Sequence, residues 1–150
     1  MILNIGCGRK PVEGAINHDL IKHGDYVDVI HDLNEYPWPW DDETADVIYA
    51  KDVLEHPNNL IKSLEECWRI LRMGGKLRLS MPHWQSDYGH DDPTHRWFLT
   101  LHSMDYFVRD TRYEKDFGFY SPMRWIQHSV ERHGGEVVWL LEKDIGHFMA

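Results

Sequence analysis

One helix–glycine–strand unit near the middle of the sequence constrains the fold more than any other feature. Its apolar side chains recur at helical spacing along one stripe, formed by Leu60, Ile61, Leu64, Trp68 and Leu71. We therefore expect a helix from about Asn58 to Arg72, ended by Gly74-Gly75 and followed by a strand over Lys76–Met81. Because this order is typical of a right-handed crossover between parallel strands, the sequence predicts an α/β fold.

Short apolar segments before this unit predict the other strands of the sheet. The segment Asn34–Glu43 contains Pro37 and Pro39 and is expected to be a loop. Four strands are predicted around it, at Met1–Ile5, Ala15–Leu20, Tyr26–Leu33 and Ala45–Ala50.

The last third of the sequence leaves more than one interpretation open. Pro82–Pro93 is expected to be a polar loop, and Trp97–Phe107 one or two short helices. Arg124–Arg132 and Glu136–Lys143 flank a glycine pair and favour a hairpin, which would add an antiparallel edge to the sheet. The alternative is a helix from Pro122 followed by a single strand.

Length, charge and cysteine content exclude several classes of protein. The 150 residues predict one domain, spanning residues 1–150, and the formal net charge of −9 argues against nucleic acid as a partner. Cys7 and Cys67 have no metal-binding spacing and form no disulfide framework. Without a signal peptide or an apolar run of roughly 20 residues, we expect a cytoplasmic protein with no membrane partner.

Three strand ends carry residues that suit a nucleoside ligand. Gly6-Cys7-Gly8 follows the first strand, where the absent Cβ atoms would let backbone approach a ligand closely. Asp19 and Asp32 stand at the ends of the second and third strands, and a carboxylate there can accept hydrogen bonds from ribose hydroxyls or an adenine amino group. Each feature alone is typical of an ordinary turn, but together they favour a nucleoside.

The order of these segments resembles that of a known enzyme family. LNIGCG, INHDL, HDLNEYPWPW, ADVIYAKDVLEH and RILRMGGKLRLSMPH resemble the successive motifs of the class I S-adenosylmethionine-dependent methyltransferases, especially short stand-alone bacterial and phage members. The resemblance covers Met1 to about Phe107. It implies a Rossmann-like fold with a mostly parallel sheet, an antiparallel C-terminal end, and S-adenosyl-L-methionine as cofactor.

Carried over by position, the resemblance also implies a set of cofactor-binding residues. They are Asn4, Gly6, Cys7, Gly8, Asp19, Leu20, Asp32, Leu33, Ala50 and Lys51. Two departures from the family pattern are expected. The few residues between Gly8 and Asp19 leave no room for the usual first helix, and nothing precedes the first strand to form an N-terminal lid.

A histidine- and aspartate-rich segment after the fifth predicted strand is the candidate catalytic region. It contains His83, Asp87, His90, Asp91, Asp92 and His95. We expect His95, or else His83, to act as a general base for an acceptor hydroxyl or amine. The alternatives are that these side chains hold the loop by hydrogen bonds or bind a metal ion, although the predicted reaction requires no metal.

The function predicted from the sequence is S-adenosylmethionine-dependent methyl transfer to an unidentified acceptor, either a small molecule or a sugar. One alternative is a non-catalytic S-adenosylmethionine-binding module or partner subunit. Another is an enzyme on the same scaffold that cleaves the cofactor. The seven Trp residues are also compatible with a homodimer that covers apolar surface.

Overall fold

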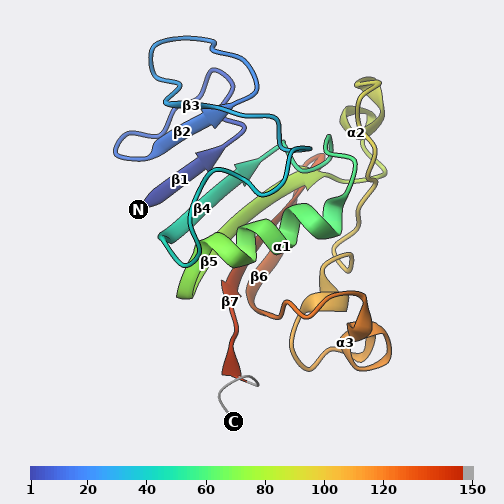
Figure 1. Cartoon of the computed structure of the whole chain (residues 1–150). Coiled ribbons are helices and arrows are strands. Elements are labelled where there is room, and N and C mark those ends of the chain that lie inside the picture. The colour runs from blue at the N-terminus through green and yellow to red at the C-terminus, as the bar shows by residue number, and fades with distance from the viewer. Residues whose placement is uncertain (147–150) are drawn as a thin grey trace.

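The computed structural model describes residues 1–146, and its strands form a single mixed sheet (Figure 1). The strand order is β3-β2-β1-β4-β5-β7-β6. Strands β1 to β5 pair in parallel, whereas β7 runs antiparallel to both β5 and β6. The strands are β1 (Ile2–Ile5), β2 (Ile16–Asp19), β3 (Val29–Ile30), β4 (Ala45–Lys51), β5 (Leu71–Pro82), β6 (Trp125–His133) and β7 (Glu136–Lys143).

Few helices accompany this sheet. The longest is α1 (Leu60–Ile70), which links β4 to β5, and the side chain of Asn59 caps it by accepting a hydrogen bond from the amide of Lys62 at 2.9 Å. Two short helices, α2 (Asp87–Asp91) and α3 (Arg112–Phe117), lie between β5 and β6 with the 3₁₀ turns Asp105–Phe107 and Gly118–Tyr120. Within residues 1–146, no helix has the length and apolar character needed to cross a membrane.

The strand register divides the sheet into a buried face and a half-open face. On the buried face, Leu3, Ile48, Leu77 and Leu141 form one row across four strands and are each 0% exposed. The helix α1 lies across this face (Figure 1). On the other face Tyr49 is half-buried and its neighbour Arg78 is exposed, so polar side chains there meet solvent. One helical layer therefore leaves one face of the sheet largely uncovered.

The loop between β3 and β4 supplies part of the core that a helix would otherwise provide. Trp38 and Trp40 are buried, and the indole Nε1 of Trp38 donates to the carbonyl oxygen of Leu33 at 3.0 Å. The guanidinium of Arg69 on α1 donates to the carbonyl oxygens of Trp38 at 3.2 Å and Trp40 at 2.9 Å. These bonds join the loop to the helix and hold both indoles against the sheet.

Several sequence-based predictions of structure are confirmed. The structure contains the predicted strands at the start of the chain, the C-terminal hairpin and the antiparallel end of the sheet. As predicted, no helix stands between the first two strands. The described chain between β1 and β2 is a turn-rich loop. The residues between β2 and β3 also form no helix. The predicted strand Tyr26–Leu33 is reduced to Val29–Ile30.

Other boundaries were wrong, for identifiable physical reasons. The predicted helix Asn58–Arg72 ends at Ile70, because the carbonyl oxygen of Ile70 accepts a hydrogen bond from the amide of Thr44, the residue just before β4. The strand then begins at Leu71 and passes through Gly74, which has a φ of +71°. The predicted loop Pro82–Pro93 contains α2, and Trp97–Phe107 is helical only as the 3₁₀ turn at its end.

Candidate functional site

A pocket of about 450 Å³ opens at the carboxyl ends of β1, β2, β3 and β4. In an open parallel sheet this edge is where ligands bind, beside the point at which the strand order reverses. Here the order reverses between β1 and β4. Its lining residues are Gly6, Gly8, His18, Asp19, Leu20, His31, Asp32, Leu33, Asn34, Asp52, Val53, His56, Pro57 and Thr94.

The glycine-containing loop after β1 has a backbone that other residues could not adopt without strain. Gly6 has a φ of +64°, and a Cβ atom there would lie 2.4 Å from Cγ2 of Val53. Gly8 has a φ of +53°, and a Cβ atom there would meet nothing within 4 Å. The close approach at Gly6 therefore requires glycine for both backbone and packing, as expected for a loop pressed against a ligand-binding edge.

The side chain of His18 forms a hydrogen bond to this loop. This role of His18 was not predicted from the sequence. Its Nδ1 accepts a hydrogen bond from the amide of Gly6 at 3.2 Å, and its Nε2 donates to the carbonyl oxygen of His31 at 2.9 Å. Burial lowers the pKa of His18, so the ring is held in its neutral form. The signal in the sequence that could have identified His18 was a polar residue directly before the expected ribose-binding Asp19, in the predicted strand segment INHDL.

The two predicted nucleoside-binding aspartates lie on the same pocket. The Asp19 carboxylate accepts hydrogen bonds from the amides of Gly8 and Leu20, each at 2.7 Å. Asp32 accepts from the amide of Asn34 at 2.9 Å. A carboxylate offers about four acceptor positions, so each aspartate retains capacity for hydroxyl or amino donors of a ligand.

The remaining predicted cofactor residues divide between the pocket and its surroundings. Leu20 and Leu33 line the pocket. Asn4, Cys7 and Lys51 instead line an adjoining cavity of about 590 Å³ on the half-open face of the sheet. Ala50 is fully buried in the core. The sequence-based prediction thus placed most of these residues around one edge of the sheet, although not all in one cavity.

Asp52 lies between the two cavities and lines both of them. It follows β4 directly and has a φ of +52°, a conformation that aspartate tolerates better than most residues. Burial, reinforced by the neighbouring carboxyl group of Glu136, raises the pKa of Asp52 to about 7. A pocket acid with this pKa was missed from the sequence, although Asp52 stands within the quoted segment ADVIYAKDVLEH.

The two histidines predicted as general bases occupy different environments. His83 is 5% exposed, and its Nδ1 accepts a hydrogen bond from the amide of Gln85 at 3.1 Å, outside the lining of the pocket. His95 lies edge-on against His56, with ring centroids 4.7 Å apart. His56 does line the pocket. His95 therefore does not line the pocket itself but contacts a residue that does.

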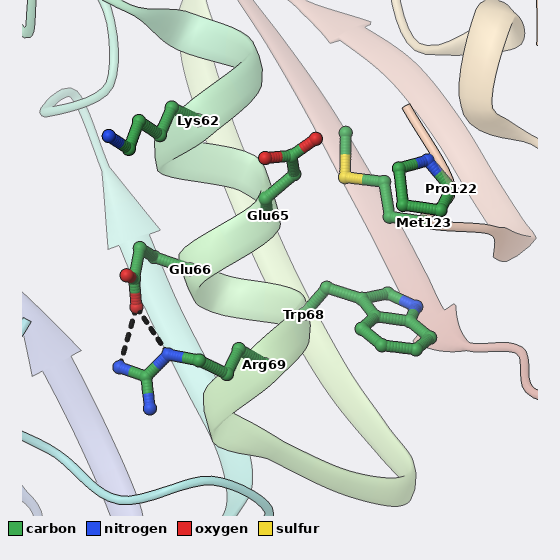
Figure 2. Close-up of a pocket in the computed structure, with 7 residues that line it drawn as sticks. All are labelled: Lys62, Glu65, Glu66, Trp68, Arg69, Pro122 and Met123. Atoms are coloured by element: carbon green, nitrogen blue, oxygen red, sulfur yellow. Dashed lines mark hydrogen bonds and ion pairs between the residues drawn. The ribbon is translucent and has the colours of Figure 1, made fainter. Parts of the chain in front are cut away.

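A larger cavity of about 610 Å³ lies elsewhere on the molecule, between α1 and the segment that enters β6 (Figure 2). Trp68, Pro122 and Met123 contribute its apolar wall, and Glu66 pairs with Arg69 at its margin at 2.6 Å. It contains neither the glycine loop nor the strand-end aspartates. Its size alone therefore does not make it the candidate site.

Comparison with known proteins agrees with this arrangement. A family model described as a methyltransferase domain matches residues 17–79. The chain is 37% identical over 68 residues to sterol 4-C-methyltransferase strm-1 of Caenorhabditis elegans, a match covering 45% of this chain and 20% of that protein. A solved S-adenosylmethionine-dependent methyltransferase from Archaeoglobus fulgidus aligns with a TM-score of 0.62 and 15% identity, covering 95% of this chain and 85% of that one.

This chain has the class I methyltransferase fold. The resemblance predicted from the sequence motifs is thereby confirmed at the level of the fold. The [4+2]-cyclase SpnF aligns comparably, with a TM-score of 0.63 and 12% identity over 97% of this chain and 75% of that one. The chain also spans only about a fifth of the length of the curated relative that it matches. The reaction of this methyltransferase-fold chain must therefore be argued from its site.

Proposed function

We propose that this chain binds S-adenosylmethionine in the pocket at the carboxyl ends of β1, β2, β3 and β4, here called the strand-end pocket, and transfers its methyl group to an acceptor. One observation carries the proposal: the pocket combines Gly6, Gly8, Asp19 and Asp32 at the carboxyl ends of three adjacent parallel strands. Asp19 would accept the ribose hydroxyls, and Asp32 the amino group of adenine. The sulfonium end of the cofactor would lie toward Asp52, where the pocket meets the adjoining cavity.

The chemistry required of the protein is modest. The acceptor nucleophile forms a bond to the methyl carbon while the bond from that carbon to sulfur breaks, and S-adenosylhomocysteine leaves. Most of the rate enhancement would come from holding the two reactants in line. We assign the acceptor proton to Asp52 rather than to His95 or His83, because Asp52 lines both cavities and the two histidines line neither.

The proposal extends to the acceptor and the setting of the protein. A small molecule or a sugar is favoured as acceptor over nucleic acid, since the formal net charge is −9. A reducing, cytoplasmic location is supported by the free thiols of Cys7 and Cys67. Residues 1–150 are proposed to act as one domain, and a homodimer would cover exposed aromatic side chains such as Phe119, which is 81% exposed.

Formation of S-adenosylhomocysteine with a panel of hydroxyl and amine acceptors tests this function. We expect product only when both cofactor and acceptor are present. The Asp52→Asn variant should turn over about 10²- to 10⁴-fold more slowly, as loss of a positioned base does. Tight cofactor binding with no product from any acceptor would favour the non-catalytic binding module, and cofactor breakdown without acceptor would identify a cleaving enzyme.

A further inference from the structure

Three side chains with metal-binding atoms meet at the edge of the strand-end pocket. Glu55 and His56 follow β4, and His95 comes from the segment after α2. One ligand atom from each residue lies within 4.8 Å of the other two. Glu55 is 1% exposed, and neither of its carboxylate oxygens has a hydrogen-bond partner. An unpartnered buried carboxylate is costly unless something positive or protic meets it.

The hydrogen bonds around the two imidazoles fix where their protons lie. The hydroxyl of Thr94 donates its proton to Oδ1 of Asp92 at 2.7 Å. Oγ1 of Thr94 must therefore accept the hydrogen bond from Nδ1 of His56 at 2.8 Å. In His95, Nδ1 lies 2.9 Å from the carbonyl oxygen of Gly89, to which it can only donate. Each neutral ring therefore has its lone pair on Nε2.

Where Glu55, His56 and His95 meet, the carboxylate and the two Nε2 atoms are therefore all hydrogen-bond acceptors, and none of them is a donor. Nε2 of His56 lies 3.5 Å from Oε1 of Glu55. Two lone pairs and a buried carboxylate in such proximity require a shared positive charge, supplied either by a proton or by a metal ion.

We propose that Glu55, His56 and His95 bind a divalent transition-metal cation. Two imidazole nitrogens and one carboxylate suit Zn²⁺, Mn²⁺, Fe²⁺ or Co²⁺ and leave coordination positions open. The outer hydrogen bonds from His56 to Thr94 and from His95 to Gly89 are of the kind that orient metal-binding histidines. This differs from our sequence-based expectation that no metal is used, which considered His95 only with the neighbouring residues of its own loop.

The location suggests what the cation would hold. His56 and Thr94 line the strand-end pocket, and Asp52 joins it to the adjoining cavity. An oxygen atom of the acceptor, from a hydroxyl group, would take an open coordination position beside the cofactor. That role rests on the proposed methyltransferase function, whereas binding of the metal itself does not.

Metal binding is tested on the full chain without cofactor, after removal of metals with a chelator. Titration with Co²⁺ and Zn²⁺, followed by calorimetry and by the visible absorption of bound Co²⁺, should give one equivalent bound. Both cations should also raise the melting temperature. In Glu55→Gln and His56→Gln the affinity should fall by more than the roughly 10- to 100-fold that loss of an outer partner causes.

A matched control separates this site from adventitious binding by the other histidines. His102 stands three residues from Asp105 on the surface, as His95 stands three residues from Asp92, and its side chain is 78% exposed. His102→Gln should bind metal as the parent does. Absence of stoichiometric binding in the parent, or equal losses in His102→Gln and His56→Gln, would overturn the proposal and leave a shared proton in its place. His56 is the least buried ligand, so His56→Gln decides the outcome if Glu55→Gln fails to fold.

Discussion

The imidazole Nδ1 of His18 accepts a hydrogen bond from the backbone amide of Gly6 at 3.2 Å. The other ring nitrogen donates to the carbonyl oxygen of His31 at 2.9 Å, so the ring connects the loop after β1 with the end of β3. Both connected segments line the strand-end pocket. Protonation of Nδ1 would remove the acceptor of the Gly6 amide, and the geometry of the pocket therefore depends on a neutral His18.

We expect this relationship to make stability depend on pH. Burial lowers the pKa of His18 in the folded chain, while the hydrogen bond to the His31 carbonyl oxygen and the nearby carboxylate of Asp19 only partly oppose this shift. The unfolded chain then binds a proton more readily, so the stabilisation is fully present above about pH 6.5 and is lost as pH falls through the lower folded pKa. Urea unfolding of the parent at pH 7.5 and pH 5.5 (about one pH unit on either side of that value) measures the loss.

The variant His18→Asn isolates this effect. Asparagine keeps an acceptor for the Gly6 amide but does not titrate, so part of the parental loss between the two pH values should disappear. Identical pH dependence in the parent and His18→Asn would show that this imidazole does not titrate with unfolding.

The glycines of the loop after β1 should respond differently to alanine. Both have positive φ angles, which cost an alanine about 1–2 kcal/mol of folding free energy. Only at Gly6 would the new Cβ also press on Val53, adding roughly 1–3 kcal/mol for overpacking. Gly6→Ala should therefore lower the free energy of unfolding more than Gly8→Ala. Equal losses in denaturant titrations would mean that Val53 moves aside freely.

Asp52 should make the pocket prefer a cationic cofactor. S-adenosylmethionine carries a sulfonium charge that S-adenosylhomocysteine lacks, and a nearby carboxylate stabilises the charged form. In Asp52→Asn the ratio of the two affinities should shift toward S-adenosylhomocysteine by roughly 10-fold, the lower end of what an adjacent opposite charge contributes. Asp41→Asn, at an exposed position, is the control. An unchanged ratio in Asp52→Asn would place the sulfur elsewhere in the pocket.

The sequence alone predicted the parts of the fold that local patterns determine. The apolar stripe of α1, the Gly-Cys-Gly turn and the glycine pair between β6 and β7 each carry a local signal, and each appears in the structure. The end of α1 was misplaced because a tertiary contact decided it, namely the hydrogen bond from Thr44 to Ile70. Gly74-Gly75 was then taken for the helix stop, whereas both glycines lie within β5, where its register against β4 shifts.

The site was predictable where residues act from strand ends and unpredictable where distant segments meet. Asp19 and Asp32 could be placed because parallel strands bring their carboxyl ends to one edge. The association of Glu55 with His95 joins residues about 40 positions apart through the hydrogen bond from the Arg96 amide to the Glu55 carbonyl oxygen. No periodicity in the sequence reports such a contact, so His95 was considered only with its neighbours along the chain.

Calorimetric titration of S-adenosylmethionine into the parent, Asp19→Ala and Asp25→Ala tests the central claim most directly. The account predicts one site in the parent and an affinity about 10- to 150-fold weaker in Asp19→Ala, the equivalent of losing charge-assisted hydrogen bonds of roughly 1.5–3 kcal/mol. Asp25→Ala, changed at an exposed position of the loop after β2, should bind as the parent does. Absence of binding heat and of any melting shift in the parent at millimolar cofactor would contradict the account.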